Sequence, residues 1–252
     1  MDILAGFHSE SALYASERWR DRTKFNKDLI PILKDIPDSD LSSSIVEICG
    51  ASGCGKTFLA IEIANWAIKN GDVIILNCSG DIKSHLIQKN SPFKIHIVEI
   101  FDWNGLECAI AMLPEMLFQI ENVNCVIVDG IDNIYFYHEY KSLSDGDHQT
   151  FKNYLDSTIK KLTSLFSNYH NKIMCFYTRE DSDFAPSQPR IFLQKENQQS
   201  SNSYAMIQSP NYSAQNVSVN EATKLRVKVL GKLPKTRMWR DTATWPTAKT
   251  LP

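Results

Sequence analysis

The clearest chemical signal in the sequence is a glycine-rich run that ends in lysine and threonine. Glycines at these spacings let successive backbone N–H groups point into one concavity around phosphates, which a Cβ atom would obstruct. The lysine can then reach the β- and γ-phosphates, and the threonine hydroxyl can ligate Mg²⁺. We therefore predict a site for ATP and Mg²⁺ in this run, formed by Gly50, Ser52, Gly53, Cys54, Gly55, Lys56 and Thr57.

An aspartate that ends an apolar strand is the second candidate for the same site. Asp129 closes the run 125–129, and we predict that it positions Mg²⁺ through a water molecule, as such aspartates do in P-loop nucleotide hydrolases. Asp132 follows three residues later and is predicted to be an ordinary loop residue. The predicted metal ligands are thus Thr57 and Asp129.

Hydrolysis requires a further group that orients the attacking water, usually a carboxylate or glutamine near the γ-phosphate. The loop at 77–81 follows the second predicted strand, 73–76, and Asp81 is its only acidic residue. No catalytic residue is assigned apart from Asp81 as a weak candidate. We expect nucleotide binding with slow turnover.

Short β-branched runs alternate with segments of helical periodicity around these residues, which favours a parallel sheet covered on both faces. Strands are expected at 44–49, 73–76, 94–100, 125–129 and 172–177, and helices at 58–69, 106–120 and 151–169. We predict an α/β fold with three parts: an N-terminal arm at 1–40, a core at 41–240 and a C-terminal tail at 241–252.

Two segments near the end of the predicted core differ in composition. Residues 181–220 are rich in Ser, Gln, Asn and Pro, which predicts a long mobile loop. Residues 223–230 and 235–240 are expected to form a β-hairpin. Its clustered cations are candidates for binding single-stranded DNA, namely Arg226, Lys228, Lys232, Lys235 and Arg237.

Composition excludes some classes of protein. The formal net charge of −2 does not indicate nucleic-acid binding by the chain as a whole. The sequence has no apolar run long enough to span a membrane and no secretory leader at its start, so we expect no membrane partner and an intracellular location. The six cysteines lack metal-ligand spacing and are expected to be reduced, buried thiols.

These features resemble the RecA-type recombinase superfamily, in particular the short paralogues of the eukaryotic strand-exchange recombinase. Residues 44–50 are similar to the strand that enters the glycine loop in that family, 126–131 to its "LLIVDSI" strand, and 224–228 to its closing basic hairpin. The resemblance implies a RecA-like P-loop core with a C-terminal β-hairpin. The catalytic glutamate of the family aligns with Ser79, and its glutamine sensor aligns near 178–180, which also implies weak hydrolysis.

The resemblance also implies partners and a location. Gly6, Phe7 and Ala12 are similar to the segment by which recombinase protomers bind a neighbour, with Glu10 where that motif has alanine, so Phe7 is a candidate for partner binding. The family's DNA-facing loops correspond to 135–149 and 183–220. The implied role is that of a nuclear mediator. It joins another paralogue in a heteromer, engages the recombinase filament on single-stranded DNA and assists strand invasion.

Three alternatives stay open at the level of sequence. A P-loop kinase acting on a small metabolite shares the glycine loop, although the segment 181–220 has only one arginine for a lid. Transport and AAA-type ATPases have a similar glycine-loop sequence, but the other motifs typical of them are absent from this sequence. The third alternative is an interaction scaffold that uses its nucleotide as structural support.

Overall fold

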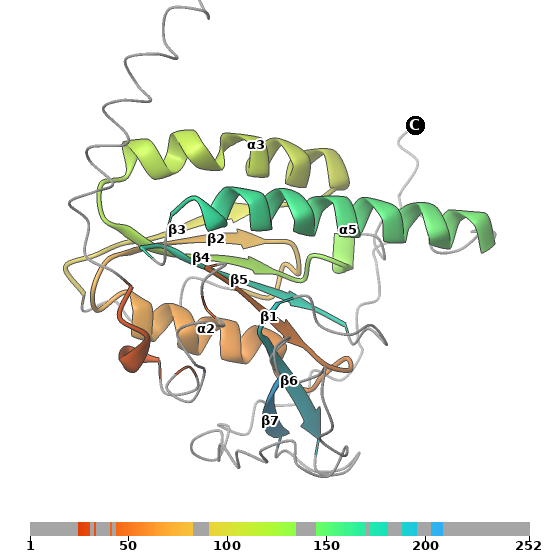
Figure 1. The fold of residues 1–252 in the computed structure, drawn as a ribbon, viewed down its shortest axis with the longest axis horizontal. Coiled ribbons are helices and arrows are strands. Elements are labelled where there is room, and N and C mark those ends of the chain that lie inside the picture. Colours follow the sequence, from red (N-terminus) through yellow and green to blue (C-terminus); the bar gives the residue numbers. More distant parts are fainter. Residues whose placement is uncertain are drawn as a thin grey trace, which may run out of the picture.

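A mixed sheet forms the centre of the fold (Figure 1). The computed structural model describes residues 25–30, 33, 41, 44–82, 91–134, 145–169, 172–180, 188–195 and 203–208. Within these ranges the sheet has seven strands in the order β3-β2-β4-β5-β1-β6-β7. Their bounds are β1 Ile45–Cys49, β2 Asp72–Asn77, β3 Ile95–Glu99, β4 Val123–Asp129, β5 Met174–Arg179, β6 Arg190–Lys195 and β7 Ser203–Gln208. The strands from β3 to β6 run parallel, and β7 pairs antiparallel with β6 at one edge.

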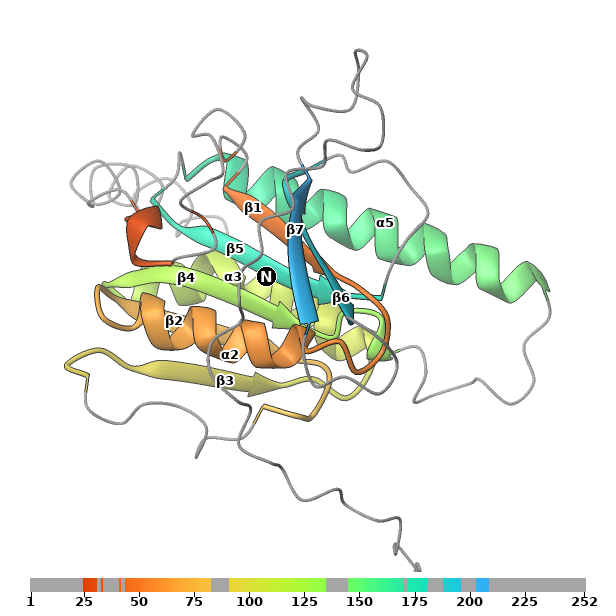
Figure 2. The same ribbon diagram turned by 90° about the horizontal axis from the view of Figure 1, so that it is seen from below.

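Helices cover both faces of this sheet. Helix α2 (Lys56–Ala67) packs on one face, while α3 (Trp103–Gln119) and α5 (Asp145–Ser167) lie on the other (Figure 1). From below, α2 stands in front of the strands (Figure 2). A short 3₁₀ helix, η1 (Lys27–Leu29), precedes β1. The predicted class, α/β with a mostly parallel sheet flanked by helices, is confirmed.

Two hydrophobic clusters hold the layers together. Val46 and Ile48 of β1 belong to the cluster beneath α2, whereas Ile45 belongs to the cluster beneath α3 and α5. Successive strand residues point to opposite faces, so a strand covered on both faces must be apolar throughout, and this is why the strands read as continuous apolar runs. Ile30 and Leu33, from the predicted arm, are buried in the α2-side cluster.

Element boundaries differ from the predicted ones where polar residues begin an element. Helix α2 starts at Lys56 rather than 58, because the glycine loop leads directly into its first turn. Helix α5 starts at Asp145, six residues before the predicted start, in a polar stretch without apolar periodicity. In α3 the Asp102 side chain accepts a hydrogen bond of 2.6 Å from the Gly105 N–H, which fixes the start of that helix.

The prediction of one long loop at 181–220 was wrong, because β6 and β7 lie inside this segment. Ile191 and Leu193 of β6 are buried in the α2-side cluster, and β1 offers β6 an open edge for parallel pairing. Burial of a short apolar stretch therefore outweighs the polar composition of the segment. The hairpin expected at 223–240 lies outside the described residues.

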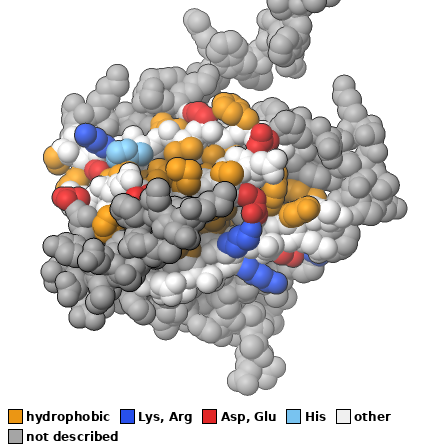
Figure 3. Space-filling model, turned by 90° about the horizontal axis from the view of Figure 1, so that it is seen from above, with side chains coloured by type: hydrophobic (Ala, Val, Ile, Leu, Met, Phe, Trp, Pro, Cys, Tyr) orange, Lys and Arg blue, Asp and Glu red, His pale blue; other side chains and the backbone are white. Residues whose placement is uncertain are grey.

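All six cysteines are free, and five are buried as predicted, while Cys108 is exposed. Figure 3 shows hydrophobic side chains gathered on the face that carries α3 and α5, where Met112 and Tyr154 are more than half exposed. Trp103 is partly buried and packs against the core beneath these helices. No described helix combines the length and apolarity needed to cross a membrane.

A comparison of two glycine substitutions tests the junction between the glycine loop and β6. A Cβ atom on Gly50 would lie 2.3 Å from the Leu193 carbonyl oxygen, and the residue has a φ of +149°. We expect Gly50→Ala to lower the free energy of unfolding by about 2–5 kcal/mol, from strain and overpacking together. Gly55 also has a positive φ of +96°, but its Cβ would meet no atom within 4 Å. The control Gly55→Ala should cost only about 1–2 kcal/mol, so equal losses in urea denaturation would contradict this account.

Candidate functional site

The glycine loop joins the carboxyl end of β1 to the first turn of α2. Gly53 and Gly55 have φ values of +71° and +96°, left-handed conformations that favour glycine. Gly55 is the N-cap of α2, no side chain caps this helix, and its first turn contains no acidic residue. The first N–H groups of α2 therefore keep their hydrogen-bonding capacity and the positive end of the helix dipole for an anion.

Lys56 lies over this loop and is held by its carbonyl groups. The Lys56 ammonium donates hydrogen bonds of 2.8 Å to the Gly50 carbonyl and 3.2 Å to the Ala51 carbonyl. Ser52 is exposed, whereas the Cys54 side chain is buried in the α2-side cluster and its N–H donates to the Ala51 carbonyl at 3.3 Å. Cys54 thus closes the turn of the loop, and Lys56 is the cation at its rim.

Asp129, at the carboxyl end of β4, is fully buried and receives hydrogen bonds from three hydroxyl groups. Its Oδ2 accepts from Thr57 at 2.9 Å and from Ser79 at 2.6 Å. Its Oδ1 accepts from Thr178 at 2.8 Å, and Thr178 in turn accepts from the Gly130 N–H at 2.6 Å. The carboxylate therefore joins α2, the loop after β2 and the end of β5 at one edge of the sheet.

The surroundings of Asp129 disfavour the ionised form of its carboxyl group. Burial raises its pKa above the usual range, and the hydrogen bonds from Ser79, Thr178 and Thr57 offset only part of this effect. The charge of nearby Asp81 raises the pKa further. A cation beside Asp129 would relieve the cost of keeping it ionised.

Asp132 lies in a loop as predicted, but it is not an ordinary exposed loop residue. It is 6% exposed, and one carboxylate oxygen accepts a hydrogen bond from the Glu180 N–H, which ties the loop after β4 to the end of β5. Its Oδ1 is buried and has no hydrogen-bond partner among the residues that the structure describes. Burial raises the pKa of Asp132, while the hydrogen bond from the Glu180 N–H and the charge of Lys56 lower it. This contact could not be predicted from the sequence, because a position three residues after Asp129 indicates no particular partner.

The loop after β2 places Asp81 on the same edge. Asn77 Oδ1 accepts a hydrogen bond from the Gly80 N–H at 3.1 Å and lies 3.2 Å from Ser79 Oγ, while the Asp81 N–H donates to Ser79 Oγ at 3.1 Å. Asp81 is exposed, whereas Ser79 is 4% exposed and contacts Asp129 directly. The weak catalytic candidate therefore lies at the rim, and a neutral hydroxyl occupies the interior.

The arrangement suits Mg²⁺ bound through few protein oxygens. Mg²⁺ usually keeps several waters and binds one or two carboxylates together with phosphate oxygens. Thr57 Oγ and the Asp129 carboxylate supply hard oxygen ligands 2.9 Å apart, next to the glycine loop. No group of three or more His, Cys, Asp or Glu side chains suited to a metal occurs in the described part of the chain.

The structure thus brings together the glycine loop, Lys56, Thr57 and Asp129. Ser79, Thr178 and Asp132 lie at the same edge of the sheet, and their hydrogen bonds there were not predicted from the sequence. The remaining predicted site residues lie outside the described ranges, namely Phe7, Arg226, Lys228, Lys232, Lys235 and Arg237.

Comparison with known proteins gives no match, either to a protein-family model or to a curated protein. The class of the protein therefore follows from its own architecture. It is an α/β protein whose parallel sheet, flanked by helices, is consistent with a P-loop-like or Rossmann-like fold.

The raised pKa of Asp129 generates a prediction about stability. A carboxylate whose pKa is raised in the folded state lowers the free energy of unfolding as pH rises from about 4 through the folded pKa, by about 1.4 kcal/mol for each pKa unit. Asp129→Asn lacks this titration, and its amide nitrogen can donate to Thr57 and Ser79 while its oxygen still accepts from Thr178. We therefore expect the variant to gain stability relative to the wild type between pH 4 and pH 7.

Urea denaturation at both pH values measures this difference. Asp81→Asn is the matched control, because it removes an exposed carboxylate from the same edge and should change stability by no more than about 0.5 kcal/mol. If Asp129→Asn is less stable than the wild type by the same amount at both pH values, ionisation of Asp129 does not lower the free energy of unfolding, which contradicts the prediction.

Proposed function

We propose that this chain is an ATP-binding, RecA-like recombinase paralogue that acts in DNA repair by homologous recombination. It binds ATP and Mg²⁺ at the glycine loop and Asp129, and it hydrolyses ATP slowly or not at all. In a heteromer with another paralogue it engages single-stranded DNA and promotes or remodels recombinase filaments in the nucleus.

The observation that carries the nucleotide proposal is the contact between Thr57 and Asp129 beside an uncapped helix start. A phosphate chain on the α2 N-terminus would lie next to Lys56 and close to both oxygen ligands. When bound, Mg²⁺ would supply positive charge that neutralises the phosphates. Thr57 and Asp129 would hold the metal, and Lys56 would exchange the loop carbonyls for phosphate oxygens.

The position of β5 supports the RecA-like assignment. This strand lies between β1 and β4, so its carboxyl end meets the site, where Thr178 contacts Asp129. Ser79, which aligns with the family's catalytic glutamate, contacts the same carboxylate. Ser79, and Thr178 in the segment 178–180 where the family's glutamine sensor aligns, thus both contact Asp129, which supports the proposal.

The same convergence supports slow hydrolysis. Ser79 and Thr178 are neutral at both positions, and a hydroxyl already engaged with Asp129 is a poor base for activating water. Asp81 stands at the rim, and one oxygen of Asp132 is bonded to the Glu180 N–H. In the proposed role, bound ATP orders the subunit, and energy from ATP hydrolysis is not required.

Equilibrium binding of labelled ATP to wild type and Lys56→Ala tests the nucleotide site. Loss of a charge-assisted hydrogen bond, about 1.5–3 kcal/mol, should weaken ATP binding about ten- to hundred-fold. Lys69→Ala is the control, since it removes an exposed lysine just beyond the other end of α2 and should bind as wild type does. Phosphate release by the wild type should stay below about 1 s⁻¹.

Other outcomes of this assay would exclude the proposal. Equal ATP affinity in Lys56→Ala and wild type would remove the site from the glycine loop. Faster phosphate release, without any effect of DNA, would indicate another kind of ATPase. ADP production stimulated by a small metabolite would indicate a P-loop kinase.

Charge reversal in the basic C-terminal segment tests the proposed contact with DNA. Arg226→Glu with Lys228→Glu should weaken binding of a single-stranded oligonucleotide and make binding less sensitive to salt, because fewer counterions are released. The control Lys69→Glu with Lys94→Glu makes the same change in net charge at exposed positions elsewhere. If both double variants lose affinity equally, the effect is one of overall charge and the C-terminal assignment is wrong.

A further inference from the structure

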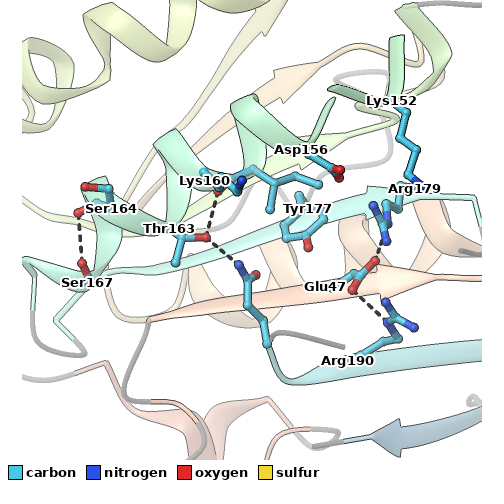
Figure 4. Close-up of a pocket in the computed structure, with 12 residues that line it drawn as sticks. Glu47, Lys152, Asp156, Lys160, Thr163, Ser164, Ser167, Tyr177, Arg179 and Arg190 are labelled. Carbon is cyan, nitrogen blue, oxygen red and sulfur yellow. Dashed lines mark hydrogen bonds and ion pairs between the residues drawn. The ribbon is translucent and has the colours of Figure 1, made fainter. Parts of the chain in front are cut away.

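A pocket of about 660 Å³, lined mostly by charged and polar residues, lies between α5 and the strands β1, β5 and β6 (Figure 4). It lies on the face of the sheet opposite α2, and neither the glycine loop nor Asp129 lines it. The lining residues are Glu47, Lys152, Asp156, Ile159, Lys160, Thr163, Ser164, Ser167, Tyr177, Arg179, Gln188 and Arg190. A cavity of this size suits a small organic molecule rather than a single ion.

One end of the pocket gathers charged groups. Figure 4 shows Lys152, Arg179 and Arg190 grouped there around Glu47, with Asp156 nearby. Glu47 accepts a hydrogen bond from Nε of Arg179 and another, of 2.8 Å, from Nε of Arg190. This end therefore holds three cations and two carboxylates, and Lys160 adds a fourth cation to the lining.

The two arginines are built into the core rather than spread over the surface. The side chains of Arg179 and Arg190 are only 10% and 5% exposed, and Glu47 between them is 3% exposed. Both arginines contact Glu47 through Nε, so this end of the pocket holds two guanidinium groups side by side. Guanidinium groups also match the geometry of phosphate oxygens.

The other end of the pocket is lined by hydroxyl and amide groups. Ser164 and Ser167 lie there (Figure 4), and Thr163 donates a hydrogen bond of 2.8 Å to the Ile159 carbonyl. Thr163 can then only accept from Gln188, at 2.5 Å, so the Gln188 amide nitrogen must face it.

Gln188 consequently directs its other amide atom elsewhere. Gln188 is 6% exposed, and its Oε1 is buried without a hydrogen-bond partner in the described ranges. A buried acceptor of this kind favours a ligand that carries a donor. Between the two ends stands Tyr177, and burial raises the pKa of its phenol, so it remains a neutral hydroxyl at physiological pH.

We propose that this pocket binds a phosphate monoester of a hydroxylated small molecule, such as a sugar phosphate or a nucleoside monophosphate. The phosphate lies among Lys152, Arg179 and Arg190. The hydroxyl groups of the ligand reach toward Thr163, Ser164 and the Gln188 oxygen. The site is separate from the proposed ATP site, and its occupancy does not depend on the glycine loop.

Calorimetric titration of the full chain tests this proposal, with Lys56→Ala as the background so that the glycine loop contributes little. The probes are ribose 5-phosphate, adenosine 5′-monophosphate, inorganic phosphate and a single-stranded oligonucleotide. We expect one or both phosphate monoesters to bind more tightly than inorganic phosphate. Binding to only one of them identifies the source of the phosphate.

Two double variants locate the ligand. Lys152→Ala with Lys160→Ala, on α5, should weaken binding of the monoester about tenfold or more. Lys161→Ala is the control on the same helix, since Lys161 pairs with Glu107 of α3 outside the pocket, and should leave affinity unchanged. Ser164→Ala with Ser167→Ala, at the hydroxyl end, should weaken binding of the monoester but not of inorganic phosphate.

Several results would overturn the proposal. The proposal is wrong if neither monoester binds, or if inorganic phosphate binds as tightly as the monoesters. It is also wrong if Lys152→Ala with Lys160→Ala leaves the affinity for the monoester unchanged. Oligonucleotide binding that alone depends on Lys152 and Lys160 would assign the pocket to DNA instead. Because ATP binding is measured separately at Lys56, failure here would leave the nucleotide proposal standing, and the reverse also holds.

Discussion

The buried carboxylate of Asp129 is the constraint on which the site depends. Three hydroxyl donors from separate elements converge on it: Thr57 from α2, Ser79 from the loop after β2 and Thr178 from β5. Together they fix where the carboxyl ends of the strands meet the glycine loop. Burial nevertheless raises the pKa of Asp129, so the arrangement holds a charge at a cost to stability. Such a cost is typical of functional sites, and a cation beside the carboxylate would offset it.

Strand β5 links this edge of the sheet to the pocket on the α5 face. Its last residues alternate in direction, so Thr178 contacts Asp129 whereas Arg179 contacts Glu47, and the next residue, Glu180, donates its N–H to Asp132. Successive residues of a strand necessarily serve different sides. One strand end therefore supplies groups to two places of different chemistry, the sheet edge that carries the glycine loop and a pocket with buried arginines. The sheet order, which inserts β5 between β1 and β4, makes this possible.

Much of this fold could be predicted because periodicity reports burial directly. The apolar runs and the glycine loop located β1, β2, β4, β5 and α2 to within a few residues. The partners of Asp129 could not be found in this way, since Ser79 and Thr178 lie about fifty residues from it in opposite directions along the chain. Glu47 did carry a usable signal: a single charge inside a strand buried on both faces requires a buried partner. β6 was missed because only three apolar residues, 191–193, mark it within a polar segment.

A crystal structure of the protein with Mg²⁺ and a non-hydrolysable ATP analogue tests the central claim most directly, that the glycine loop and Asp129 form one nucleotide site. The account predicts that the Lys56 ammonium leaves the Gly50 and Ala51 carbonyls for the phosphates, and that Thr57 Oγ exchanges its contact with Asp129 for the metal. A nucleotide bound away from the loop, with the contacts of Lys56 and Thr57 unchanged, would contradict it.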